Sequence, residues 1–161
     1  MGRTSKKTLT CTALAVTAAA VAGGLGTDPR SSWYHRLRKP SWQPPRQAYG
    51  LVWTPLYATI AYASARALSL GDERSRPALR RALAANLALN AAWPPLFFKA
   101  RSPRIALAEL VALNASNVLL TRRFLRQDRA AGLLLLPYTG WTLFATALNA
   151  SIARRNPPEK A

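Results

Sequence analysis

Five long stretches of this sequence contain almost no charged residue, although the chain carries a formal net charge of +17. They are 17 to 24 residues long, and Lys or Arg closes nearly every end. A helix needs about 20 mostly apolar residues to cross the hydrocarbon core of a membrane, whereas a soluble helix would present charges to water every turn or two. The pattern predicts an all-α fold, a five-helix transmembrane bundle forming a single domain over residues 1–161. The predicted spans are 8–27, 47–65, 82–98, 105–121 and 130–153.

The positions of the basic residues favour a membrane over nucleic acid as the partner. They flank the uncharged stretches, where they would meet water and anionic headgroups, so we predict contact with membrane lipid and no nucleic-acid binding. If the spans alternate in direction, one side carries twelve Lys and Arg and the other carries eleven. This near balance leaves the orientation in the membrane open.

Few residues suited to metal binding or acid–base catalysis are present. The chain has one His, one Cys and six carboxylates, so we predict no metal site, no cofactor and no intramolecular disulfide. We expect His35 to be a solvated loop residue and Cys11 to be a buried, inert thiol. The basic start and the apolar run that follows also fit a signal peptide. Because the run is long for one and further spans follow, we expect the first span to be retained.

The connection between the first two spans is nineteen residues long, DPRSSWYHRLRKPSWQPPR. Structureless loops of this length are uncommon and often act as lids. Aromatic residues beside basic ones are also typical of a segment lying at headgroup level. The residues alone leave both interpretations open. For a lid, the residues of interest are Tyr34, Pro40 and Trp42.

Polar and aromatic side chains recur at helical spacing within three of the predicted spans. A polar side chain is costly in lipid, so the two Asn residues of the third span should face protein or a cavity. A structural hydrogen bond between helices is the simpler role for them. Several Trp and Tyr rings with a few convergent polar groups are nonetheless typical of a ligand pocket. The candidate pocket residues are Trp53, Tyr57, Asn86, Asn90, Trp93, Tyr138, Trp141, Ala145 and Leu148.

Two further features of the spans bear on assembly and chemistry. Ala84, Ala88 and Ala92 form a small-residue face on the third span, which favours close approach of another helix and predicts a dimer interface. Glu109 lies four residues inside the fourth span. It either reaches the membrane interface or is a buried functional acid.

Three motifs resemble the TspO/MBR family, the translocator proteins. They are WYHRLRKPSWQPPRQAYGLVWTPLY at 33–57, NLALNAAWPPLFFKAR at 86–101 and LLPYTGWTLFATALNASIARRN at 135–156. Their order and their coverage of most of the chain make the resemblance specific. Ala-rich and Arg-rich usage is typical of a bacterial member, which predicts a multi-pass protein of the bacterial cytoplasmic membrane.

The resemblance implies a five-helix bundle, commonly a homodimer, with a pocket that the first loop closes. It implies that porphyrins such as protoporphyrin IX bind there, between Trp53 and Trp141. It also implies that Pro40 and Trp42 belong to the lid. The sequence departs from animal members of the family at two places. Leu148-Asn149 is not followed by the Tyr of the cholesterol-recognition pattern, so specific cholesterol binding is not predicted. Ile105 replaces a Trp that helps to line the pocket in animal members.

Three functions follow from this resemblance. The first is a porphyrin-binding membrane protein that senses, sequesters or transports its ligand, with the propionates near Arg36, Arg38 and Lys39. The second is an enzyme that degrades porphyrin oxidatively with light and oxygen, using Trp53 and Trp141. The third is a structural or partner-modulating membrane protein without a physiological small ligand.

Overall fold

The computed structural model describes residues 4–157, and this part of the chain folds into helices and connections without a strand. The all-α prediction is therefore confirmed. The elements in chain order are α1 (Lys6–Gly26), α2 (Ser32–Arg36), α3 (Arg46–Leu70), η1 (Glu73–Ser75), α4 (Arg76–Pro94), η2 (Pro95–Lys99), α5 (Pro103–Gln127), α6 (Arg129–Leu134) and α7 (Leu136–Arg155).

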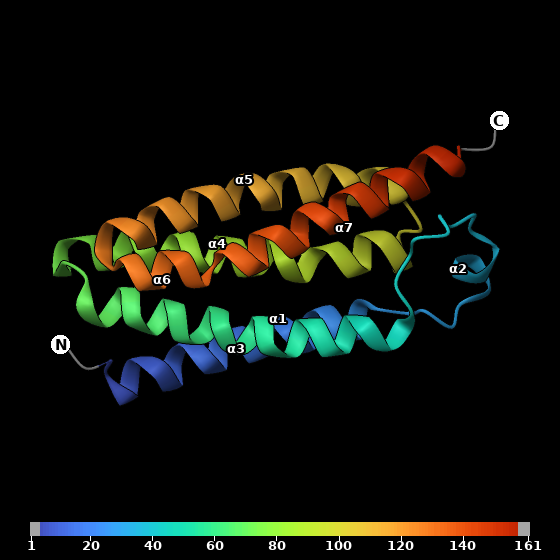
Figure 1. The fold of residues 1–161 in the computed structure, drawn as a ribbon. Coiled ribbons are helices and arrows are strands. Elements are labelled where there is room, and N and C mark those ends of the chain that lie inside the picture. Colours follow the sequence, from blue (N-terminus) through green and yellow to red (C-terminus); the bar gives the residue numbers. More distant parts are fainter. Residues whose placement is uncertain (1–3, 158–161) are drawn as a thin grey trace.

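The long helices lie side by side in an elongated bundle (Figure 1). Helix α1 packs on α3 and α4, and α5 packs on α4 and α7. The short helix α2 and the chain on either side of it lie at one end, beyond the ends of α1 and α3. Apolar side chains from several helices, including Ile60, Leu83, Leu120 and Phe124, form the buried core.

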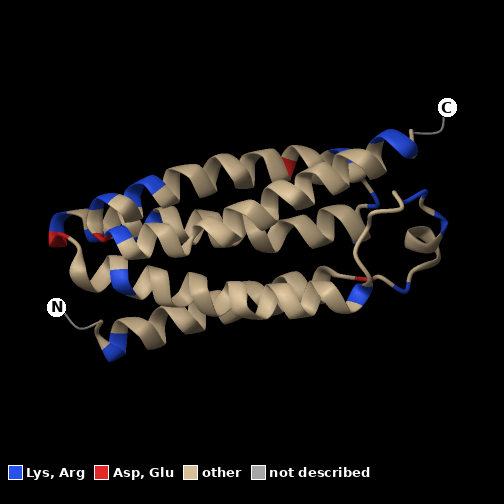
Figure 2. Ribbon diagram, in the orientation of Figure 1, with Lys and Arg blue, Asp and Glu red and all other residues tan. Residues whose placement is uncertain are grey.

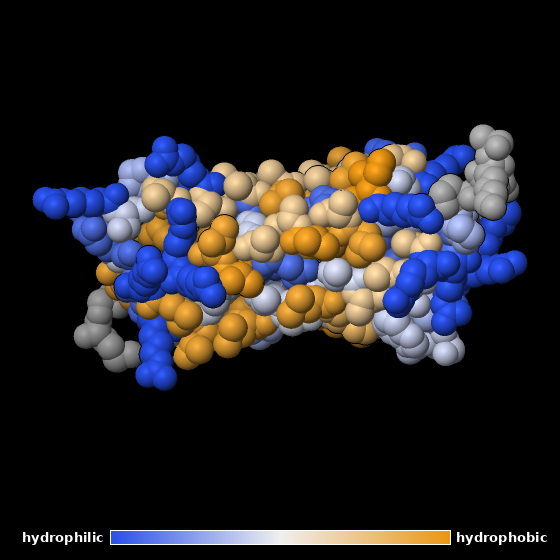
Figure 3. All heavy atoms as spheres, turned by 90° about the horizontal axis from the view of Figure 1, so that it is seen from above, coloured by the Kyte–Doolittle hydropathy of each residue, from blue (hydrophilic) through white to orange (hydrophobic). Residues whose placement is uncertain are grey.

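Among residues 4–157, three segments are long and apolar enough to cross a membrane: Lys6–Gly26, Pro103–Gln127 and Arg129–Arg155. Lys and Arg gather at the two ends of the bundle and are nearly absent from its middle (Figure 2). The space-filling view shows hydrophobic side chains over much of the middle of one face and hydrophilic ones at both ends (Figure 3). This distribution matches a hydrocarbon layer bounded by water on two sides.

Proline residues account for two differences between the predicted spans and the observed helices. Regular α-helix ends at Pro94, and Pro95–Lys99 forms a π turn in which Ala100 N donates to Pro95 O at 2.9 Å. The last predicted span is interrupted at Leu135, two residues before Pro137. Proline has no N–H and its ring crowds the preceding turn, which favours an interruption of the helix at these positions. A single proline does not always interrupt a helix, since α3 continues through Pro55.

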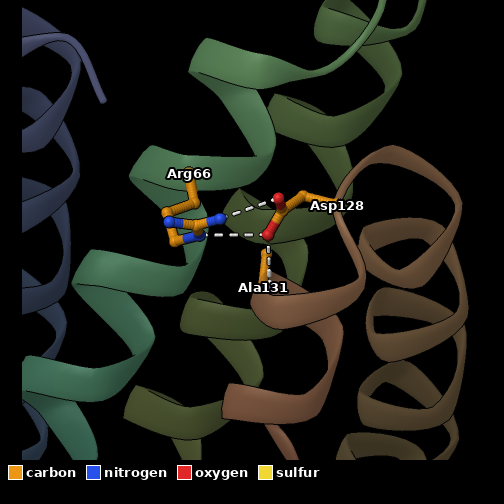
Figure 4. Close-up of polar contacts among 3 residues, drawn as sticks. All are labelled: Arg66, Asp128 and Ala131. Atoms are coloured by element: carbon orange, nitrogen blue, oxygen red, sulfur yellow. Dashed lines mark hydrogen bonds and ion pairs between the residues drawn. The ribbon is translucent and has the colours of Figure 1, made fainter. Parts of the chain in front are cut away.

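An ion pair fixes α6 against α3 at one end of the bundle (Figure 4). Arg66 Nε and Nη2 donate to the two oxygens of Asp128 at 3.0 and 2.8 Å. Asp128 also caps α6, since Asp128 Oδ1 accepts from Ala131 N at 2.7 Å. The hydrogen bonds from Arg66 hold the pKa of Asp128 below its usual value. One carboxylate thus joins three elements, α3, α5 and α6.

Helix α1 approaches the start of η2 very closely at Gly26. A methyl group built there would lie 2.6 Å from Pro95 Cδ and 2.9 Å from Pro95 N. Only glycine allows this packing, which brings the end of α1 against the π turn.

Cys11 lies on the exposed side of α1, so the expectation of a buried thiol is wrong.

Candidate functional site

A cavity of about 350 Å³ lies inside the bundle, near the end that carries α2. Its volume falls in the range of about 300–1,000 Å³ typical of ligand pockets. Side chains from α1, α3, α4, η2, α5 and α7 line it, together with residues of the long first loop. The wall is mostly apolar, with a few polar groups.

Most of the predicted pocket residues line this cavity: Trp53, Tyr57, Asn90, Trp93, Trp141, Ala145 and Leu148. Asn86 and Tyr138 do not line it, because both are fully buried behind the wall. Spacing predicted the inward faces of the helices, but it could not distinguish a residue at the cavity surface from one a layer deeper.

The indoles of Trp53 and Trp141 meet at the wall from α3 and α7. Their ring centroids are 6.5 Å apart and their planes are perpendicular. Trp53 stacks on Tyr57 at 5.0 Å, and Trp141 stacks on Phe144 at 5.2 Å. Within the described chain, Trp93 Nε1 donates to Asn149 Oδ1, whereas the indole N–H groups of Trp53 and Trp141 have no protein acceptor.

A hydrogen-bonded chain runs from the cavity into the core. Tyr57 Oη donates to Asn90 Oδ1 at 3.1 Å, and Asn90 Nδ2 donates to Tyr138 Oη at 3.1 Å. Tyr138 Oη donates to Asn86 Oδ1 at 3.3 Å, and Asn86 Nδ2 donates to Asn117 Oδ1 at 2.6 Å. Asn86 therefore serves as a structural link between α4 and α5, whereas Asn90 both bonds and faces the cavity.

A second aromatic cluster joins the first loop to the bundle. Trp93 stacks on Phe97 at 5.1 Å, and Trp33 and Tyr34 of the loop pack edge-on against Phe97 at 5.5 and 6.3 Å. Trp93 Nε1 also donates to Asn149 Oδ1 at 3.0 Å. These contacts bring Tyr34 to the cavity wall.

The other two predicted lid residues lie outside the cavity lining. Trp42 is 48% exposed and packs against Phe144 at 5.8 Å. Pro40 is buried in the loop. Pro40 therefore packs within the loop and Trp42 holds the loop against α7, both outside the cavity lining.

The basic group at the cavity is Arg46, and the sequence-based expectation named other residues. Arg46 lines the cavity, donates to Pro29 O at 2.9 Å and contacts His35 Nε2 at 3.3 Å. Lys39 instead lies 4.4 Å from the centre of the Tyr34 ring, and burial lowers its pKa. Arg36 and Arg38 do not line the cavity, so the expected basic partners lie elsewhere.

Several lining residues had no clear signal in the sequence. Small residues of α1 form one wall, and three phenylalanines of η2 and α7 form another. The π turn shifts the first two phenylalanines out of regular helical spacing, and small residues carry no chemical signature. These residues are Ala20, Gly23, Gly24, Phe97, Phe98 and Phe144.

Comparison with known proteins identifies the family. Residues 11–155 match the TspO/MBR family. The chain belongs to the TspO/MBR family. It is 38% identical over 138 residues to the tryptophan-rich protein TspO of Chlorobaculum tepidum, covering 84% of this chain and 87% of that one. It is 36% identical to the protein CrtK of Rhodobacter capsulatus, over 94% and 96% of the two chains. The human translocator protein is 37% identical over 77% of this chain and 75% of its own.

This membership and the three long apolar segments identify the chain as a membrane protein. Glu109 of this TspO/MBR protein is 8% exposed, so its carboxylate is buried within the bundle. Neither of its carboxylate oxygens has a hydrogen-bond partner among residues 4–157. It is absent from the cavity lining, although Leu110 and Leu113 of the same helix take part in it.

The predicted small-residue face and Ile105 both lie on the outer surface of this TspO/MBR bundle. Ala84 and Ala88 are exposed and Ala92 is half-buried, so the small-residue face is open along most of its length. Ile105 is 55% exposed and is not part of the cavity wall. A side chain at this position in α5 points away from the cavity.

Proposed function

We propose that this TspO/MBR protein binds a porphyrin such as protoporphyrin IX in the intramembrane cavity. The observation that carries the proposal is the pair Trp53 and Trp141, set at right angles on the wall with both indole N–H groups unpaired within the described chain. Flat apolar rings bind well against such indoles. The names of two relatives, "Tryptophan-rich sensory protein" in Cereibacter sphaeroides and "Translocator protein" in Sus scrofa, favour sensing, sequestration or transport.

In this proposal five helical units cross the membrane. Helices α3 and α4 join the three apolar segments. They contain 25 and 19 residues, about 37 and 28 Å at 1.5 Å per residue. Helices α3 and α4 are less apolar than the three segments. In α4 the polar Asn86 and Asn90 contribute to this difference, but both are buried inside the bundle and do not face lipid. We propose the bacterial cytoplasmic membrane as the location.

The first loop, residues 27–45, acts as the lid. Tyr34 and Gln43 line the cavity, and Gln43 Nε2 donates to Tyr34 Oη at 3.1 Å. Arg46, immediately after the loop, offers the guanidinium that a porphyrin carboxylate would meet. The carboxylate end of the ligand would therefore lie toward the lid, with the ring deeper between the helices.

Porphyrin titration in detergent tests the proposal. Protoporphyrin IX should quench the tryptophan fluorescence of the wild type. Replacing both Trp53 and Trp141 with Phe should weaken its affinity severalfold, because each substitution removes an indole N–H and part of the aromatic surface while keeping a ring. The control is Tyr62→Phe, an exposed ring that belongs neither to the cavity wall nor to the first loop. Unchanged affinity in the double variant would contradict the proposal.

A second candidate function is oxidative breakdown of the bound porphyrin. The contact of oxidisable rings favours it, since Trp53 stacks on Tyr57 and lies edge-on to Tyr138 at 6.2 Å. Molecular oxygen would be the oxidant and light absorbed by the porphyrin the trigger. Conversion of the porphyrin spectrum under illumination, lost in Trp53→Phe and Trp141→Phe, would separate this function from binding alone.

We further propose that the protein forms a homodimer through Ala84, Ala88 and Ala92. The exposed alanines of α4 would let a second copy approach closely. Ala88→Phe should reduce cross-linking of the dimer, while Ala115→Phe, at an exposed position on α5, should not. Equal cross-linking in the two variants would reject this face.

A further inference from the structure

A second cleft lies at the same end of the bundle as the lid, outside the ligand cavity. Its volume is about 420 Å³. The end of α2, the connection from η2 into α5 and the end of α7 form its walls. The lining residues are Trp33, Arg36, Leu37, Arg101, Ser102, Pro103, Arg104, Asn156 and Pro157.

Three arginines converge on this cleft, and none of them has an ion-pair partner among residues 4–157. Arg36 comes from α2, and Arg101 and Arg104 flank the start of α5. No carboxylate from the described part of the chain is among the lining residues. The two ion pairs found among residues 4–157 involve other arginines, Arg66 and Arg76. Three like charges around one cleft repel one another, and an anion placed between them would relieve this repulsion.

Hydrogen bonds hold the walls of the cleft together before any ligand binds. Asn156 Oδ1 accepts from Arg38 N at 2.9 Å, and Asn156 Nδ2 donates to Arg38 O at 3.0 Å. This reciprocal pair ties the end of α7 to the first loop. Asn149 Nδ2 also donates to Pro103 O, which ties α7 to the start of α5. The arginines are therefore carried by segments in a fixed relation to one another.

The backbone of Arg101 is unusual. Its φ angle is +54°, and it is the one non-glycine residue with positive φ in the described chain. Residues other than Gly and Asn rarely adopt this conformation, and such strained positions cluster at functional sites. Arginine here costs backbone energy that glycine or asparagine would avoid. The positive charge that Arg101 places at the cleft is a reason for an arginine at this position.

The start of α5 strengthens the attraction for an anion. This helix has 25 residues, and Ser102 caps it by accepting from Ile105 N at 3.3 Å. The N-terminus of a long helix carries a partial positive charge that favours phosphate groups. Arg104 lies in its first turn, which contains no acidic residue.

We infer that this cleft binds the phosphate headgroup of one anionic phospholipid. The position of the cleft favours a lipid as its ligand, because the cleft lies where α5, one of the apolar membrane-spanning candidates, begins. Ile105 follows Arg104 directly and is 55% exposed, so a lipid could place its phosphate among the arginines and an acyl chain along α5. Headgroup level is where Lys and Arg meet lipid phosphate.

The test measures lipid binding to the full chain in a neutral detergent by native mass spectrometry. The cleft variant combines Arg36→Gln, Arg101→Asn and Arg104→Gln, since Asn tolerates the positive φ of position 101. The matched control combines Arg30→Gln, Lys99→Gln and Arg154→Gln, three exposed cations that do not line the cleft.

The cleft variant should bind phosphatidylglycerol about tenfold more weakly or worse, and the control within about threefold of the wild type, because charge-assisted hydrogen bonds depend on position. Phosphatidylcholine should bind weakly to all three proteins, and inorganic phosphate should neither compete nor raise the melting temperature. Equal loss in the two triple variants would overturn the proposal. So would phosphate competing as well as the lipid, which would indicate a free-anion site.

Single variants keep the test decisive if the triple variant does not fold. Arg101→Asn relieves strain, so its melting temperature in phosphatidylcholine should not fall below that of the wild type. Its affinity for phosphatidylglycerol should nevertheless drop severalfold, and Arg101→Lys should restore part of it. Full affinity in Arg101→Asn would contradict the inferred role of this residue.

Discussion

Tyr57 and Asn90 join two helices at the cavity wall through one hydrogen bond, from Tyr57 Oη to Asn90 Oδ1 at 3.1 Å. Asn90 passes the connection on to Tyr138 in α7. Since Trp53 stacks on Tyr57, this chain also fixes the orientation of the indole on which a ligand would rest. The core network thereby preorganises the aromatic wall.

Removing the Tyr57 hydroxyl should destabilise the protein and loosen the site. Tyr57→Phe leaves Asn90 Oδ1 without its donor, at a cost of about 1 kcal/mol. A lower melting temperature in detergent and weaker porphyrin binding should follow. Tyr62→Phe is the control, because Tyr62 is 43% exposed. Equal effects of the two variants would contradict the role of this bond.

Arg46 should contribute to affinity only when the ligand carries free carboxylates. Arg46→Gln should weaken binding of protoporphyrin IX by roughly tenfold, the value of one charge-assisted hydrogen bond. The dimethyl ester of the same porphyrin should bind the variant and the wild type alike. Arg38→Gln, outside the cavity, should change neither affinity. A similar loss for the ester would show that Arg46 acts only on the lid.

The ion pair of Arg66 and Asp128 should make the stability of the folded protein depend on pH in the acidic range. Because the pKa of Asp128 is lowered in the folded protein, its contribution is present above the unfolded value of about 3.9 and is lost as pH falls through the lower folded value. Asp128→Asn keeps a capping residue but removes the charge. It should cost about 1 kcal/mol at neutral pH, and the difference from the wild type should vanish in acid. A constant difference across pH would reject the ion-pair explanation.

Gly26 should not tolerate a side chain, whereas Gly50 should. Gly26→Ala places a methyl group against Pro95 and should cost about 1–3 kcal/mol through overpacking. Gly50 has open space at the same position, so Gly50→Ala in α3 should raise stability by about 0.5–1 kcal/mol. Thermal unfolding in detergent compares the two. Stabilisation by Gly26→Ala would show that α1 and η2 are not in close contact.

The sequence predicted those parts of the site that depend on regular spacing. Trp53 and Trp141 lie where the helical period puts them, because α3 and α7 are regular around them. Phe97 and Phe98 escaped prediction because the consecutive prolines before them start a π turn. Arg46 escaped it because no periodicity relates a residue after a long loop to a cavity formed by distant helices.

Two other parts of the structure could not be predicted from the sequence: the small residues of the cavity wall and the surroundings of Glu109. Gly23 and Gly24 form part of the wall through their small size, and the sequence around them reads only as an apolar span. Glu109 shows the opposite problem: its position four residues inside a predicted span fits both an interfacial and a buried carboxylate. Only the packing of α5 against its neighbours decides between the two.

Filling the cavity tests most directly the claim that a porphyrin binds inside this bundle. Ala145→Phe adds a ring to the cavity wall, while Leu143→Phe adds a similar ring on the lipid-facing side of the same helix, where Leu143 is 55% exposed. The measurement is the dissociation constant of protoporphyrin IX for the two variants and the wild type in the same detergent. We predict a loss of about tenfold or more for Ala145→Phe and none for Leu143→Phe, as steric exclusion from a formed pocket requires. Equal affinity in all three proteins would contradict the account.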